Sequence, residues 1–140
     1  MKSGILIFMI LSTLTFQTCR NSQKSGTGEY NPDAAYVQVV MFHLERRCAS
    51  CDAVENETRS LLDGEYSEAL KEGRVRFVSL DFQSESGKRA AAILRATGQT
   101  LYVISGDSIS NLTSAAFMFA QTDPDFYRNA LRKELDRFLK

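Results

Sequence analysis

The protein has 140 residues, of which 44% are hydrophobic and 24% are charged, a composition that is ordinary for one globular domain with a single core. Its 17 basic and 17 acidic residues cancel, and no basic stripe interleaved with aromatic residues occurs, so nothing indicates a nucleic-acid partner. Three cysteines are too few for a disulfide scaffold that would hold a small secreted fold together.

Residues 1–19 have the pattern of an export signal. Lys2 precedes an apolar run from Ile5 to Phe16, which is shorter than the about 20 apolar residues that a membrane-spanning helix needs. The run ends at Gln17-Thr18-Cys19, which is similar to the end of a bacterial lipoprotein signal, where the cysteine is acylated. An ordinary cleaved signal and an uncleaved anchor are the alternatives, and all three export the domain. We therefore predict an extracytoplasmic, membrane-anchored protein, a bacterial lipoprotein facing the periplasm, with Cys19 as its lipidation site.

A polar linker separates this signal from the folded part. Residues 20–34 are rich in polar residues and glycine and have no apolar period, as expected of a flexible tether. The domain is predicted over residues 35–140, with its start between Tyr30 and Ala35. Its first element, residues 36–44, is almost continuously apolar and rich in β-branched and aromatic residues, which predicts a central strand buried on both faces.

Apolar residues at helical spacing predict a helix that begins at or just after Cys48-Ala49-Ser50-Cys51. The spacing runs from Val54 to Leu62, and Asp63-Gly64 is expected to stop the helix. A short second helical piece leads to Gly73, and residues 75–82 then predict a second strand. The cysteine pair is therefore expected at the N-terminus of a helix inside a strand–helix–strand unit.

The second half of the chain predicts a helix followed by a hairpin. Ser84 is a suitable N-cap for this helix, and Gly98 is placed to end it. Residues 101–104 predict a third strand, Ser105-Gly106-Asp107 is a turn signal, and residues 109–112 are expected to return as an antiparallel edge strand.

Asp123-Pro124 starts the closing helix, while residues 113–122 fit either a short strand or a helical lead-in. The order β-α-β-α-β-β-α calls for a parallel sheet continued by a hairpin, with helices on both faces. The predicted class is α/β, a three-layer α/β/α sandwich with a mixed central sheet.

The spacing of Cys48 and Cys51 predicts a reactive thiol pair. Three positions on the first helical turn let Cys48 face solvent while Cys51 lies behind it within bonding reach. The positive end of the helix favours a Cys48 thiolate, so its pKa should fall below the free value of about 8.5, and Arg46 and Arg47 are placed to add to this effect. Cys48 would then attack a partner disulfide, and Cys51 would release the mixed disulfide.

Other interpretations of the pair remain open. A zinc site needs two further Cys or His ligands, but the only histidine is His43 and Cys19 belongs to the signal, so no metal site is predicted. A structural disulfide across so tight a loop would remove little entropy from the unfolded chain. Coincidental buried thiols are the third alternative. His43 is expected to make a local hydrogen bond rather than to tune the thiolate, and no cofactor is expected.

From Ala35 to Lys140 the chain resembles the thioredoxin-like superfamily, because the strand, the cysteine pair and the later elements follow its order. Residues 42–51 are similar to the ArsF-type family of small bacterial nitrophenyl-compound nitroreductase subunits, whose members share an Arg-Cys-x-x-Cys motif. The resemblance implies a thioredoxin-like sandwich and thiol chemistry. The family name implies a link to nitroaromatic reduction, but no residue here suggests a flavin or nitroaromatic pocket.

The chain departs from thioredoxins at three positions. Arg47 stands where tryptophan precedes the first cysteine, and Phe42 stands where a buried acid lies six residues before it. Gln99 or Thr100 occupies the place of the cis-proline that shapes the substrate groove. These departures imply a narrow, specific partner or occasional soft-metal binding. The residues expected to form the substrate groove or to tune the thiols are Arg46, Arg47, Ala49, Ser50, Gln99 and Thr100.

The sequence thus predicts a thiol–disulfide exchange protein whose partner is a protein dithiol or disulfide. The alternative is a non-enzymatic binding module or an accessory subunit, acting through protein contact, electron delivery to a larger reductase, or soft-metal binding. No nucleic-acid partner is expected.

Overall fold

The computed structural model describes residues 28–140. The predicted signal, the lipidation site Cys19 and the first part of the predicted tether lie outside the described residues. The elements in chain order are β1 (Val37–His43), α1 (Ala49–Glu65), α2 (Ser67–Lys71), β2 (Val75–Asp81), α3 (Glu85–Leu94), β3 (Thr100–Ser105), β4 (Ser108–Asn111), α4 (Thr113–Phe119) and α5 (Pro124–Phe138).

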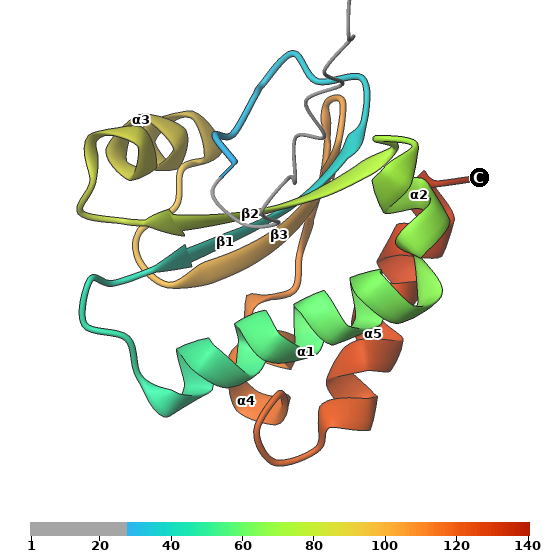
Figure 1. Ribbon diagram of the computed structural model, residues 1–140. Helices are drawn as coiled ribbons and strands as arrows, with labels where there is room; N and C mark the ends of the chain where they lie inside the picture. Colours follow the sequence, from blue (N-terminus) through green and yellow to red (C-terminus); the bar gives the residue numbers. More distant parts are fainter. Residues whose placement is uncertain (1–27) are drawn as a thin grey trace, which may run out of the picture.

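The four strands of this part of the chain form one mixed sheet in the order β2-β1-β3-β4. β1 and β2 are parallel, whereas β3 is antiparallel to both β1 and β4. Figure 1 shows α1, α4 and α5 on one face of the sheet and α3 on the other. The protein therefore has an α/β, thioredoxin-like fold with three layers.

The direction of β3 corrects the expectation of a parallel sheet continued by a hairpin. β2 ends with Asp81 opposite His43, and β3 starts with Thr100 opposite Phe42. The end of β2 and the start of β3 therefore both lie beside the C-terminal end of β1. The segment that contains α3 therefore connects two strand ends on the same side of the sheet, and β3 must run antiparallel to β1. Apolar periodicity identifies a strand but carries no information about its direction.

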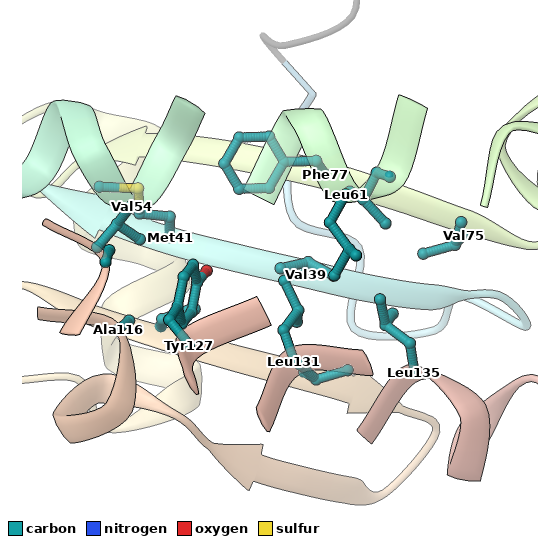
Figure 2. Packing of buried hydrophobic residues seen from close by; sticks show 14 of the residues in the cluster. Val39, Met41, Val54, Leu61, Val75, Phe77, Ala116, Tyr127, Leu131 and Leu135 are labelled. Carbon is teal, nitrogen blue, oxygen red and sulfur yellow. The ribbon is translucent and has the colours of Figure 1, made fainter. Parts of the chain in front are cut away.

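β1 lies at the centre of two apolar clusters, as its continuous apolar character predicts. Val37, Val39 and Met41 belong to the cluster that α1, α4 and α5 cover, whereas Val40 and Phe42 belong to the cluster that α3 covers. Figure 2 shows the first of these clusters, with Val39 and Met41 among side chains of α1 and α5. The strand therefore places its last residues, and the loop that follows them, in a fixed position.

Two buried hydroxyl groups lie in the cluster between α1 and α5 and satisfy each other. Thr58 Oγ1 donates to the carbonyl of Val54 at 2.6 Å, and the hydroxyl of Tyr127 lies 2.6 Å from Thr58 Oγ1, where it can donate in turn. Both residues have no exposed surface, so an unpaired hydroxyl here would cost stability. This pair fixes the position of α5 against α1.

Gln38 attaches the start of the domain to the sheet. Its side chain is 2% exposed, its Oε1 accepts from Asn31 N at 3.0 Å, and its Nε2 donates to Asn31 O at 2.7 Å. Tyr30 packs against the α3-side cluster, and Ala34 is buried. The last residues of the segment predicted as tether therefore lie against the domain.

Helix boundaries differ from the sequence-based expectations in two places. α1 continues through Asp63-Gly64 to Glu65, because Leu61 and Leu62 pack into the core and tertiary packing outweighs the low helix propensity of one glycine. α3 ends at Leu94 rather than at Gly98, because Arg95 adopts a left-handed conformation with φ 54°.

Residues 113–119, which fitted either a strand or a helical lead-in, form the helix α4. Ala116 and Ala120 pack into the cluster with α1 and α5. No helix in residues 28–140 combines the length and apolarity needed to cross a membrane.

Two glycines in helices should respond oppositely to the same substitution. Gly64→Ala should raise the free energy of unfolding by about 0.5–1 kcal/mol, because an added Cβ meets nothing within 4 Å and alanine favours the helix. Gly87→Ala should lower it by about 1–3 kcal/mol, because that Cβ would lie 1.9 Å from the Asp81 carbonyl oxygen. Urea unfolding of both variants measures the two changes, and a shift of the same sign in both would contradict this account.

Candidate active site

The loop after β1 brings Cys48 to the start of α1. Cys48 has an extended backbone, with φ −107° and ψ 163°, and its carbonyl accepts from Asp52 N at 3.1 Å, the first hydrogen bond of the helix. Cys48 is exposed, whereas Cys51, in the first turn, has no exposed surface. Both cysteines are free thiols, and their Sγ atoms lie 3.2 Å apart. A disulfide of about 2.05 Å can therefore form by a small side-chain movement.

The exposed thiol is the more acidic of the two. The pKa of Cys48 lies below its ordinary value, first because of the hydrogen bond with the Cys51 side chain and then because of the Cys51 backbone N–H. Partial burial opposes this effect, while the amide of Gln99 and the N–H of Ser50 add to it. Cys48 is therefore the sulfur that is ready to act as a thiolate nucleophile.

The buried thiol has the opposite tendency. Burial raises the pKa of Cys51, and the hydrogen bond with the Cys48 side chain and the charge of a Cys48 thiolate raise it further, while the Cys48 backbone N–H and the positive charge of Arg47 lower it. Cys51 therefore keeps its proton in the free dithiol and can share it with Cys48. This asymmetry divides the pair into an attacking and a resolving thiol.

Gln99 lies immediately before β3 and contacts both thiols. Its Nε2 donates to Cys51 Sγ at 2.9 Å and lies 3.9 Å from Cys48 Sγ. Residues 28–140 contain no cis peptide bond, so the chain crosses this position in the trans form. Thr100, the first residue of β3, has a buried hydroxyl oxygen without a hydrogen-bond partner in the described part of the chain.

Arg47 is held by two acidic residues of α1. It forms ion pairs with Asp52, at 3.2 Å, and with Glu55. Its charge acts on Cys51, whereas the causes of the lowered Cys48 pKa are hydrogen bonds. Arg46, Ala49 and Ser50 complete the surface around the pair: Arg46 and Ala49 are exposed, and Ser50 is half-buried.

The C-terminal end of β1 places no acidic or basic side chain against the two thiols. His43 Nδ1 donates to the Leu44 carbonyl at 2.9 Å, which is the local hydrogen bond expected from the sequence. Phe42 packs in the α3-side cluster, whereas Cys51 belongs to the cluster on the other face of the sheet. Phe42, which stands where thioredoxins have an acid, therefore lies on the face of the sheet opposite to Cys51. Met41, the preceding residue of β1, lies on the same face as Cys51.

Glu55 is a residue of this region that the sequence analysis missed. Its side chain is 14% exposed and accepts hydrogen bonds from Arg47, from Arg59 at 2.6 Å and 2.9 Å, and from Ser79 Oγ at 3.2 Å. The Arg59 guanidinium also lies 4.7 Å from the centre of the Phe77 ring. The spacing of Glu55 and Arg59 by four residues on a predicted helix is the one signal that sequence reasoning could have used.

Burial opposes the ionisation of Glu55, but the hydrogen bonds from Arg47 and Arg59 outweigh it, so the pKa of Glu55 lies below its ordinary value. The carboxylate therefore ties the loop before Cys48 to α1 and β2. It fixes the site without touching either sulfur.

No group of three or more His, Cys, Asp and Glu side chains within residues 28–140 is arranged to hold a metal ion. The two sulfurs of Cys48 and Cys51 are the soft ligands at this site. The site as described is a dithiol with an amide donor beside it.

No protein-family model and no curated protein matches the chain. Among solved structures, it is similar to a thioredoxin from Fasciola hepatica, with 18% identity, a TM-score of 0.46, and coverage of 74% of this chain and 82% of that one. It is also similar to a malarial protein, with 14% identity, a TM-score of 0.45, and coverage of 69% and 98% respectively. The functional argument therefore rests on the thiol pair itself.

The acidity of Cys48 should depend on the hydrogen-bonding capacity of residue 51. Cys51→Ala should raise the Cys48 pKa by about one unit, because it removes the main donor, whereas Cys51→Ser keeps a hydroxyl donor and should raise it less. The pH dependence of alkylation at Cys48, followed by mass spectrometry, gives both values. Equal pKa values in the two variants would show that the donor at residue 51 does not matter.

Glu55→Gln should destabilise the protein by about 2 kcal/mol at pH 7, because it removes a largely buried charged acceptor. Since the folded state lowers the pKa of Glu55, this stability is complete above the unfolded-state value of about 4.3 and is lost as the pH falls through the lower folded-state value. The difference between the variant and the natural protein should therefore shrink on acidification.

Denaturant unfolding at several pH values tests this expectation. Glu68→Gln is the matched control, because that side chain is 80% exposed and its ion pair with Lys71 spans 3.6 Å. A difference for Glu55→Gln that stays constant from neutral to acidic pH would contradict the linkage.

Proposed function

We propose that the protein is a thiol–disulfide exchange protein, in which Cys48 is the nucleophile and Cys51 is the resolving thiol. The observation that carries this proposal is the geometry of the pair: an exposed and a buried sulfur, 3.2 Å apart, at the N-terminus of a helix. The opposite pKa directions of the two thiols support the same division of roles. The exposure of Cys48 supports this proposal, because a partner disulfide can reach its sulfur.

The exchange proceeds in two balanced steps. The Cys48 thiolate attacks one sulfur of a partner disulfide, a bond forms between Cys48 and that sulfur, and the other partner sulfur leaves as a thiolate. The Cys51 thiolate then attacks Cys48 Sγ, the Cys48–Cys51 disulfide forms, and the partner leaves with the electron pair as a second thiolate. Both partner thiolates take protons from solvent. Two electrons pass from the dithiol to the partner, and the reverse sequence oxidises a partner.

The surroundings of the pair favour a narrow choice of protein partner. Gln99, in a trans peptide, stands where thioredoxins have a cis-proline, and its side-chain amide contacts both thiols. Arg46 and Ala49, which lie near Cys48 in the chain, are exposed, so a partner that reaches Cys48 can also contact them. We propose that the partner is a protein dithiol or disulfide.

We place this activity outside the cytoplasm, at the membrane surface. The support is the sequence of residues 1–19, with an apolar run that ends at Cys19 as in a bacterial lipoprotein signal. In a bacterial host that processes lipoproteins, Cys19→Ala should abolish incorporation of a labelled fatty acid and release the protein from membranes. Unchanged membrane association with no label in the natural protein would instead indicate an uncleaved anchor.

The decisive measurement is the reduction potential of the Cys48–Cys51 pair in the full-length chain, equilibrated in glutathione or dithiothreitol buffers. We expect a reversible two-electron transition between roughly −270 and −120 mV, because that range covers thioredoxin-type pairs. Cys48→Ser should abolish the transition, whereas the control Cys19→Ser should leave it unchanged, and Cys51→Ser should accumulate mixed disulfides through Cys48.

A pair that does not close, together with normal cellular function of Cys48→Ser, would replace this proposal with a binding module that uses the fold for protein contact. Co-purification with a flavoprotein, with loss of its activity in Cys48→Ser, would make the protein an electron-delivering subunit of a larger reductase. The similarity of residues 42–51 to the nitroreductase-subunit family supports the assignment as an electron-delivering subunit only through the shared Arg-Cys-x-x-Cys motif.

A further inference from the structure

The resolving thiol has a chemical difficulty that the fold must overcome. Cys51 must lose its proton before it can attack Cys48 Sγ, but its burial favours the protonated form. Within residues 28–140, the side-chain hydrogen bonds to Cys51 Sγ come from Cys48 and Gln99 and not from a carboxylate, and the Cys48 backbone N–H and the charge of Arg47 also lower the Cys51 pKa. The Cys51 thiolate therefore needs a donor rather than a neighbouring base to stabilise it.

One of these two side-chain donors is lost during the reaction. In the free dithiol, Cys48 can hydrogen-bond to Cys51 through its S–H group. Once Cys48 Sγ is bonded to a partner sulfur, it carries no hydrogen and can donate nothing. The Gln99 amide, 2.9 Å from Cys51 Sγ, keeps its N–H group in every state of the exchange and remains as a side-chain donor beside the Cys48 backbone N–H.

We propose that Gln99 is the positioning residue of the resolving step, and that its amide N–H stabilises the Cys51 thiolate when Cys48 is blocked in the mixed disulfide. The proposal rests on the exchange function argued above. In this step the Cys51 proton passes to solvent, the Cys51 thiolate forms a bond to Cys48 Sγ, and the Cys48–partner bond breaks with the electron pair on the partner sulfur. Gln99 holds the attacking sulfur and exchanges no proton or electron.

The position of Gln99 also explains how it can act on both sulfurs. Its backbone immediately precedes β3, which is paired with β1, so Gln99 is held next to the start of a sheet strand. The amide lies 3.9 Å from Cys48 Sγ, the atom that Cys51 must attack. The donor therefore lies close to both the attacking sulfur and the sulfur that it attacks.

The first test measures the Cys51 pKa in the full-length chain with Cys48→Ala, which removes the Cys48 donor as the mixed disulfide does. Adding Gln99→Met should raise the Cys51 pKa by about one unit, because methionine has similar length and no donor. Gln99→Glu should raise it at least as much, since a carboxylate has no N–H and repels the thiolate. The control is Gln121→Met, the same substitution at an exposed glutamine, which should change nothing.

The second test follows resolution itself. The mixed disulfide of Cys48 with glutathione is prepared, and the release of glutathione is timed across a pH range. At neutral pH, Gln99→Met should slow release about tenfold, and the rate should recover at a pH above the raised Cys51 pKa. A purely structural defect would instead slow release at every pH.

An unchanged or lower Cys51 pKa in both Gln99 variants, with their thermal unfolding transitions intact, overturns the proposal, and so does a rate loss that is independent of pH. The pKa measurement needs no partner and no redox cycle. A protein that fails as an exchange catalyst can therefore still show the Gln99 effect, and the two failures are distinguishable.

Discussion

The burial of Cys51 directly behind an exposed Cys48 is the constraint on which the chemistry of this protein depends. Cys51 packs in the apolar cluster beneath α1, where desolvation keeps it protonated, and its proximity to Cys48 gives that exposed sulfur a hydrogen bond and a lower pKa. The burial of Cys51 beside Cys48 thus shifts the pKa values of the two thiols in opposite directions. The start of α1 at Ala49 sets the spacing, because it places the two sulfurs on the same helical turn.

The rest of the fold serves to hold that turn in place. β1 is buried on both faces, so its end at His43 is fixed, and the exposed loop that follows is tied down through Arg47 and the largely buried Glu55. Glu55 in turn accepts from Arg59 of α1 and Ser79 of β2. A partly buried carboxylate that accepts several charged hydrogen bonds has few alternative positions, so the loop before Cys48 is held by a contact that does not use either sulfur.

The sequence predicted those features that local patterns encode, and missed those that arise from contacts across the fold. The buried strand β1, the helix beginning at the cysteine pair and the Ser84 cap of α3 follow from periodicity and capping chemistry. The antiparallel direction of β3 did not, since no local pattern records strand direction. Gln99 was identified only as the residue in place of a proline, because its hydrogen bond to Cys51 spans 48 positions of the chain. Glu55 has a local pairing with Arg59, but its hydrogen bond from Ser79 spans 24 positions, and no local pattern indicates that contact.

The departures from thioredoxins are connected by the geometry of the sheet. Phe42, which stands at the position of the thioredoxin acid, contributes to the α3-side cluster, where its ring meets Phe82 and Tyr102 edge-on at 6.1 Å and 6.5 Å. An acid at that position would lie in an apolar cluster on the far face of the sheet from Cys51, without a partner and at a high desolvation cost. The polar group that reaches Cys51 comes instead from the start of β3, as the amide of Gln99. An amide donates without titrating, so it stabilises a thiolate by hydrogen bonding where a carboxylate would act by accepting a proton. The polar side chain beside Cys51 is therefore an amide that precedes β3 rather than an acid from β1.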